Sequence, residues 1–213
     1  MGNYVNLKEK AYDLIKNKII NLEFMPGDYL EEKKLSELLN VSRTPIREAL
    51  ARLEAEMWVS NIPRKGIFVT LVDENMLNNI FQAREYFEPA ILGMAFNNLS
   101  SIKLNIFRER FLNYENLSQE DKDKLDNDFH LYILNSVDNV FVQNMMVTTF
   151  EHVVRVRKLS FDKKLKKRIN ESNDEHITVI DFILAGKKDE AVETLRKHIE
   201  KSYTYYLLSL IHI

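Results

Sequence analysis

Residues 40–50 read NVSRTPIREAL, a pattern that predicts a helix directly after a tight turn. Ser42 is a typical N-cap residue, because its side chain can accept a hydrogen bond from a free backbone N–H of the first turn. Pro45 falls within that turn, where the N–H that proline lacks would have no helical partner. Apolar residues then recur at helical spacing, so we expect this helix to extend from residue 43 to about residue 57.

The segments on either side of this helix complete a small module. Helical periodicity predicts a helix over about residues 6–22 and a short second helix over about residues 31–39. After the third helix the pattern changes to two short strands, residues 58–60 and 67–70. Three helices followed by a two-stranded wing predict a winged helix-turn-helix, which we place at residues 1–72.

The third helix begins with side chains that suit DNA. Arg43 and Arg47 are four residues apart and therefore project from one face. Arginine can bind guanine O6 and N7, or a phosphate, through two parallel hydrogen bonds. Ser42, Thr44 and the free N–H groups of a helix start suit phosphate oxygens. The alternative is that these side chains are merely solvated, but the order of helices, turn and wing favours DNA binding.

The turn of the predicted wing is basic. It reads Arg64-Lys65-Gly66, and glycine allows the positive φ that a tight turn demands. The two cations can follow the DNA backbone or enter the minor groove. Residues 1–72 carry 11 basic and 10 acidic side chains, and the remainder carries 19 and 22. The near-neutral charge therefore predicts DNA binding through a few placed cations and not through a broad basic field.

Residues 25–50 resemble the signature of the GntR family of bacterial transcription regulators. The resemblance rests on residues 25–30 and 35–50, which include the string SRTPIREAL. It implies DNA contacts by Lys33, Arg43, Thr44, Arg47 and the wing tip at Gly66. Many relatives carry arginine at the position of Lys33, and lysine keeps the positive charge but loses the bidentate fork.

The rest of the chain, residues 73–213, has a helical pattern throughout. Glycine (5) and proline (4) are scarce, and 45% of the residues are hydrophobic. We expect a six-helix, all-α bundle over about residues 73–97, 100–117, 120–136, 139–160, 165–185 and 188–211. The fold class is therefore mainly α. No apolar run is long enough to span a membrane, and the absence of cysteine fits a cytoplasmic protein.

Without cysteine, histidine and carboxylate are the remaining candidates for metal ligands. Asp126 and His130 are spaced i, i+4 and share one helix face, so both can bind one ion. His176 and His198 lie on the last two predicted helices. Imidazoles with one carboxylate suit a divalent transition metal, for which we expect zinc or nickel, one per chain. The alternative is that each histidine is an ordinary hydrogen-bonded residue.

This half of the chain resembles the FCD effector domain of the FadR subfamily. The resemblance rests on residues 126–130, 136–139, 175–176, 186–191 and 198–199. Metal-binding members use one Asp and three His, which implies the ligands Asp126, His130, His176 and His198. The two other histidines, His152 and His212, match no ligand position.

The resemblance further implies a small organic acid as effector. Arg84 matches the family's Arg-x-x-x-Glu segment, and its guanidinium could clamp a carboxylate. A surface salt bridge with Glu88 at i+4 is the alternative. Asn139 matches a position near the effector pocket, although helix capping explains an asparagine there equally well. Arg155 and Arg157 are weaker candidates for the same role.

Two such modules predict a ligand-responsive transcription regulator. Its homodimer would place two recognition helices on a pseudo-palindromic operator in double-stranded DNA, and the effector would shift the placement of the DNA-binding modules. Two alternatives remain open. One is a metal sensor in which the ion itself is the signal, and the other is an all-α metalloenzyme in which an Asp/His₃ site activates water. No His-Glu-x-x-His motif supports the enzyme.

Overall fold

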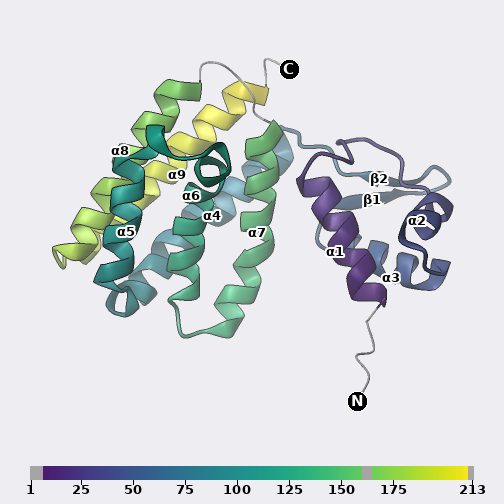
Figure 1. Ribbon diagram of the computed structural model, residues 1–213, viewed down its shortest axis with the longest axis horizontal. Helices are drawn as coiled ribbons and strands as arrows, with labels where there is room; N and C mark the ends of the chain where they lie inside the picture. Colours follow the sequence, from purple (N-terminus) through teal and green to yellow (C-terminus); the bar gives the residue numbers. More distant parts are fainter. Residues whose placement is uncertain (1–6, 160–164, 211–213) are drawn as a thin grey trace. The chain divides into compact units, whose positions relative to one another are not determined.

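The computed structural model describes residues 7–159 and 165–210, which form two compact units that divide between Val72 and Asp73 (Figure 1). The first unit contains helices α1 (Leu7–Ile20), α2 (Glu32–Leu39) and α3 (Arg43–Ala55), then strands β1 (Val59–Ile62) and β2 (Gly66–Val69). This order confirms the predicted winged helix-turn-helix.

The turn between α2 and α3 depends on one residue in a left-handed conformation. Asn40 has φ +51°, and its backbone N–H bonds carbonyls of the last turn of α2. Asparagine tolerates this conformation better than most residues because its short polar side chain can hydrogen-bond locally. Ser36 Oγ also donates to the Val41 carbonyl at 2.5 Å, which ties the turn to α2. The turn fixes how α3 leaves α2.

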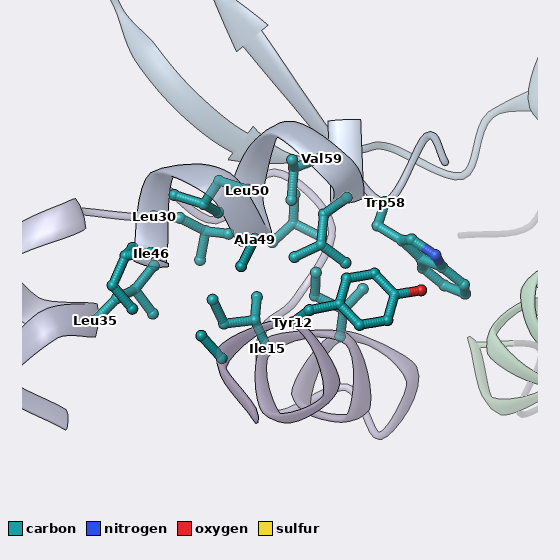
Figure 2. Packing of buried hydrophobic residues seen from close by; sticks show 13 residues of the cluster. Tyr12, Ile15, Leu30, Leu35, Ile46, Ala49, Leu50, Trp58 and Val59 are labelled. Atoms are coloured by element: carbon teal, nitrogen blue, oxygen red, sulfur yellow. The ribbon is translucent and has the colours of Figure 1, made fainter. Parts of the chain in front are cut away.

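The core of the first unit lies between α1 and α3. Figure 2 shows Tyr12 and Ile15 of α1 facing Ala49 and Leu50 of α3, and these side chains are buried. Trp58, directly before β1, is fully buried at one end of the same cluster. Each large apolar side chain buried here contributes about 1.5–3 kcal/mol. This packing holds α3 with its polar face outward.

The wing is a two-stranded antiparallel hairpin. Val59 pairs with Val69 and Ile62 with Gly66, so the strands extend further toward the turn than predicted. Arg64 and Gly66 both have positive φ, +65° and +107°. The second value confirms the conformation expected for the glycine.

Within the described residues, the second unit consists of α-helices and short 3₁₀ turns. The elements are α4 (Glu74–Ala95), η1 (Phe96–Asn98), α5 (Ser101–Leu112), η2 (Tyr114–Asn116), α6 (Gln119–Asn135), α7 (Val140–Leu159), α8 (Leu165–Leu184) and α9 (Lys188–Leu210). Helix α9 packs on α4 and α8, and α6 lies between α5 and α7 (Figure 1). The predicted all-α bundle is confirmed.

Four helices end two or more residues earlier than predicted, among them α3 at Ala55 and α4 at Ala95. Helix α1 ends at Ile20, and Leu22 then turns back with φ +60°. Helix α5 ends at Leu112, and a separate 3₁₀ turn occupies residues 114–116. The predicted helix ends at residues 6, 160 and 211 lie outside the described residues. Among the described helices, none is long and apolar enough to cross a bilayer.

Candidate functional site

The start of α3 presents an exposed polar surface. Ser42, Arg43, Thr44 and Arg47 are all exposed there. Ser42 occupies the N-cap position with extended backbone, but its side chain makes no capping hydrogen bond, so that part of the prediction is wrong. An exposed hydroxyl at a helix start, next to N–H groups that have no helical partner, suits a phosphate oxygen.

An ion pair links the recognition helix to α2. Arg47 Nε donates a hydrogen bond to Glu32 Oε2 at 2.8 Å, and the Arg47 side chain remains 66% exposed. Lys33, the next residue on α2, is equally exposed, and its Nζ lies 3.9 Å from Glu37 Oε1. Arg47 and Lys33 are therefore held loosely at the surface. DNA phosphates can compete with the glutamates for these two cations.

The wing tip presents the predicted basic residues beside an aromatic ring. Arg64 and Lys65 are exposed. A Cβ added to Gly66 would lie 2.6 Å from Tyr29 Cε2, so Tyr29 requires glycine there. Tyr29 also packs on Phe68, with ring centroids 5.3 Å apart. Nothing in the helix-turn-helix pattern singled out Tyr29 as a support for the wing.

Four side chains from three helices converge inside the second unit, and we call them the Asp/His cluster. Asp126 and His130 lie on α6, His176 on α8 and His198 on α9. One ligand atom from each lies within 4.8 Å of the others, and the three histidines are buried. The structure thus brings together the four residues that the resemblance implies as metal ligands.

The atoms of the Asp/His cluster face a common point. His176 Nε2 lies 3.2 Å from His130 Nε2 and 3.5 Å from Asp126 Oδ1. The rings of His176 and His198 have centroids 4.3 Å apart, and Phe111 stacks on the other side of His176. Three imidazoles and one carboxylate are donors that zinc and nickel accept. The residues present therefore fit a divalent transition metal.

Two histidines of the cluster, His176 and His198, favour the neutral form that a metal needs. Burial lowers the pKa of His176 well below its usual value, and the neighbouring His198 and His130 add to this effect. Burial also lowers the pKa of His198, although Glu175 opposes the shift. A neutral imidazole keeps a lone pair for an ion, so these shifts favour metal binding near neutral pH.

Arg157 of α7 reaches the Asp/His cluster. Its Nη2 forms a short ion pair with Asp126 Oδ2, and its Nε donates to Tyr206 Oη at 3.3 Å. Burial alone raises the pKa of the Asp126 carboxyl, but Arg157 and the histidines outweigh burial and hold that pKa well below its usual range. Sequence reasoning ranked Arg157 below Arg84, yet the structure places Arg157 directly beside the cluster.

Arg84 and Glu88 of α4 form an ion pair in the interior. The alternative predicted for Arg84 was a salt bridge with Glu88 at the surface. The salt bridge is present, but the predicted surface location is wrong, because the two side chains are only 2% and 3% exposed. Glu88 Oε2 also lies 2.6 Å from His130 Nδ1. Burial raises the pKa of the Glu88 carboxyl, but Arg84 and His130 outweigh it and lower the pKa to about 2. Arg84 therefore acts on the cluster through Glu88.

Glu175 of α8 contacts Nδ1 of His198, as Glu88 contacts Nδ1 of His130. Its Oε2 lies 2.8 Å from His198 Nδ1, and Arg168 donates hydrogen bonds to both carboxylate oxygens at 3.0 and 2.8 Å. Lys201 Nζ donates to Oε1 at 2.9 Å. Burial raises the pKa of Glu175, but these hydrogen bonds outweigh it and lower the pKa to about 2. Apart from the adjacency of Glu175 and His176, no sequence pattern pointed to this role.

The remaining candidates lie away from the cluster. Asn139 Oδ1 accepts hydrogen bonds from the Phe141 and Val142 N–H groups at 3.0 and 3.3 Å, so the capping interpretation is the one with observed contacts. His152 is buried on α7 outside the Asp/His cluster. His212 lies outside the described residues. An effector contact by Asn139 stays a prediction.

The winged module and its exposed recognition helix define a helix-turn-helix DNA-binding regulator. The family model described as bacterial regulatory proteins of the gntR family matches residues 7–69, and the FCD domain model matches residues 79–201. The chain belongs to the GntR family, in the FadR-like subfamily with an FCD C-terminal domain. It is therefore a transcriptional regulator and not an enzyme, which removes the metalloenzyme alternative.

Curated relatives include two named regulators. The Nta operon transcriptional regulator of Aminobacter aminovorans is 25% identical over 191 residues, covering 88% of this chain and 89% of that protein. The HTH-type transcriptional repressor RspR of Escherichia coli (strain K12) is 26% identical over 161 residues, covering 73% and 70%. Both alignments extend through the two units of this chain.

Solved structures share the fold. E. coli McbR/YncC superposes with a TM-score of 0.76 at 20% identity, covering 95% of this chain and 97% of that one. The Zn²⁺-bound FCD domain of TM0439, a putative transcriptional regulator by its own description, gives a TM-score of 0.55 at 18% identity. It covers 67% of this chain and 99% of that one. At these identities the likeness concerns the fold alone.

Proposed function

We propose that this regulator changes its affinity for operator DNA when a small organic acid binds beside a divalent metal ion in the FCD domain. The observation that carries the proposal is the convergence of one carboxylate and three buried imidazoles within 4.8 Å. The zinc-bound FCD domain of similar fold supports it. Acting on DNA, the regulator would work in the cytoplasm.

Asp126, His130, His176 and His198 would hold one ion per chain, and zinc or nickel suits this donor set. The bound ion would supply a positive centre that attracts a carboxylate. The protein supplies the orientation of the ligands and a largely buried environment, in which such attraction is stronger than in water.

Arg157 is the side chain best placed to meet the acid. Its guanidinium lies beside Asp126, and its side chain as a whole is 23% exposed, so a ligand carboxylate has a route to it. Arginine binds a carboxylate through two parallel hydrogen bonds. Arg84 is the other candidate, but its side chain is only 2% exposed, so a ligand would reach it less readily than Arg157. We therefore assign the first carboxylate contact to Arg157.

The operator would be bound by a homodimer, because a pseudo-palindromic site needs two recognition helices related by a two-fold axis. Helices α4 and α7 pack together and both leave large apolar side chains exposed. Tyr86 and Met94 lie on α4, and Phe141 and Met145 lie on α7; Phe141 is 83% exposed. We propose that a second copy of the chain covers these residues.

A metal sensor is the second candidate function. Arg157 pairs with Asp126, and a divalent ion would add positive charge at that same carboxylate. The ion could therefore displace Arg157 and act as the signal. Titrating the metal against DNA affinity without any acid separates this reading from the first.

Thermal unfolding tests the proposed ligand site. A ligand that binds only the folded protein raises the melting temperature. We expect small di- and tricarboxylates to raise it in zinc-loaded protein and to have little effect after removal of the ion with EDTA. Equal shifts in both forms, or no shift with any acid, would contradict an effector site at the metal.

A further inference from the structure

Each imidazole of the Asp/His cluster has a second ring nitrogen, and these nitrogens have different surroundings. His130 Nδ1 lies 2.6 Å from Glu88 Oε2, and His198 Nδ1 lies 2.8 Å from Glu175 Oε2. His130 Nδ1 makes no hydrogen bond of good geometry despite this short distance, so its link to Glu88 is an ion-pair contact. His176 Nδ1 is buried, with neither a hydrogen-bond partner nor a carboxylate contact among the residues that the structure describes. The three imidazoles are therefore not equivalent.

The two carboxylates determine the tautomers of their partners. An ionised carboxylate only accepts hydrogen bonds, so a neutral imidazole beside it carries its proton on the facing nitrogen. Glu88 and Glu175 thus keep the proton of His130 and His198 on Nδ1. In both rings Nε2 then keeps its lone pair, which is the state required of a metal ligand.

In protein without the ion, His176 must carry its proton on Nε2, whereas His130 and His198 carry theirs on Nδ1. Its Nε2 lies 3.2 Å from Nε2 of His130, which already presents a lone pair. Two facing lone pairs would repel, so neutral His176 carries its proton on Nε2 and donates it to His130. Its Nδ1 is then unprotonated.

We propose that Glu88 and Glu175 are positioning residues that preset two imidazoles for the ion, and that His176 alone changes tautomer when the ion binds. In this exchange His176 gives its Nε2 proton to solvent and takes one at Nδ1. The three rings together release no net proton. The inference rests on the metal site proposed above and adds which ligand must rearrange.

Nitrogen-15 NMR of the imidazole rings tests the tautomers directly, because protonated, unprotonated and metal-bound nitrogens have distinct shifts. In EDTA-treated protein at neutral pH, we expect His130 and His198 with protonated Nδ1, and His176 with protonated Nε2. After zinc is added, His176 should show protonated Nδ1, and the other two rings should keep their protons in place. A protonated Nε2 on His130 or His198, or an unchanged His176, would overturn the inference.

Variants of Glu175 test the positioning role separately from folding. Glu175 is the less buried of the two carboxylates, so its replacement perturbs the core least. Glu175→Gln keeps an oxygen that accepts from Nδ1, whereas Glu175→Ala removes it. Loss of such an outer partner lowers metal affinity by about 10- to 100-fold. We expect that loss, and a shift of His198 toward protonated Nε2, in the alanine variant, with both effects largely rescued in the glutamine variant.

Asp174→Asn is the matched control, because Asp174 is an exposed carboxylate adjacent to Glu175 on α8. It should leave zinc affinity and all three tautomers unchanged. Competition against a chromophoric chelator measures the affinity, and urea unfolding of the ion-free variants shows whether each has folded. Unchanged zinc affinity in folded Glu175→Ala would overturn the positioning role while the metal site stands. Failure of the wild-type protein to take up zinc would overturn both proposals.

Discussion

Arg47 of the recognition helix donates a hydrogen bond to Glu32 of α2, with Nε and Oε2 2.8 Å apart. The pair connects the two helices of the helix-turn-helix at its exposed face. We propose that a DNA phosphate or guanine uses the same guanidinium, so that DNA binding competes with Glu32. On this proposal the pair sets part of the balance between free and DNA-bound protein.

Replacing the two arginines at the start of α3 should remove most operator binding. Each exposed arginine that reads a base is worth about 1–3 kcal/mol of discrimination. We expect Arg43→Ala and Arg47→Ala each to lower operator affinity, and the double variant to bind operator and scrambled DNA alike. Fluorescence anisotropy at several salt concentrations measures this. Wild-type affinity in the double variant would contradict the assignment.

Neutralising Glu32, which pairs with Arg47, should strengthen DNA binding. Glu32→Gln leaves Arg47 without its anion, and an exposed ion pair is worth about 0.2–1 kcal/mol. We therefore expect a modest gain in affinity, by a factor of at most about five. Glu23→Gln makes the same charge change elsewhere in the unit, where Glu23 pairs with Lys18. An equal gain in both variants would show that net charge, and not the Arg47 pair, is responsible.

Metal content should depend on the cluster histidines. We expect about one zinc or nickel ion per wild-type chain, and clearly less in His176→Ala and His198→Ala, because each variant deletes one of four ligands. His152→Ala also removes a buried histidine, but one outside the cluster. Elemental analysis of the purified proteins gives the stoichiometry. Unaltered stoichiometry in the first two variants would contradict the site.

The ion-free protein should lose stability as the pH falls from 7.5 to 5.5. The pKa of His176 is held well below 6.5 in the folded chain and that of His198 is also lowered, whereas unfolded histidines titrate near about 6.5. The unfolded chain thus binds more protons in this window, and unfolding becomes easier as the pH falls. Glu88 and Glu175 contribute only below about pH 4.5 because their folded pKa is about 2.

Urea unfolding of EDTA-treated protein at these two pH values measures the loss. His176→Gln removes one of the depressed groups, so its free energy of unfolding should vary less with pH than that of the wild-type protein. Equal pH dependence in the two proteins would contradict the assignment of His176 as a group held neutral by burial.

The proposed dimer face should be sensitive to charge. Phe141 is 83% exposed, so Phe141→Asp should leave the fold of the single chain intact. If a second copy covers this residue, the substitution buries an unpaired carboxylate in the interface and weakens association. Sedimentation analysis should find dimers of the wild-type chain and monomers of the variant. Dimers of unchanged stability in Phe141→Asp would place the interface elsewhere.

Sequence reasoning succeeded where local rules determine the structure. The Ser-Arg-Thr-Pro string placed the start of α3 at Arg43, because residue preferences at a helix start act within one turn, even though Ser42 makes no side-chain capping hydrogen bond. The i, i+4 spacing of Asp126 and His130 put both on one face of α6. His176 and His198 lie 46 or more positions after His130, and no local rule connects residues that far apart. They were included because of the family resemblance.

The outer partners of the cluster could not be predicted in this way. Glu88 reaches His130 from α4, and Arg157 reaches Asp126 from α7, so both contacts depend on how the helices pack. The Arg-x-x-x-Glu spacing identified the Arg84–Glu88 pair but gave no measure of its burial, which the fold alone decides. Tyr29 beside Gly66 is a similar case, since 37 positions separate a loop from the wing.

The most direct test of the proposed function measures operator affinity against metal and acid together. Wild-type protein first selects its site from random double-stranded DNA, and anisotropy then gives the affinity of zinc-loaded and EDTA-treated protein with and without the organic acid that raised the melting temperature. We predict an inverted repeat, and a change in affinity of about 5-fold or more that needs both zinc and the acid. A response to zinc alone would identify a metal sensor, and an operator affinity unaffected by either would contradict the account.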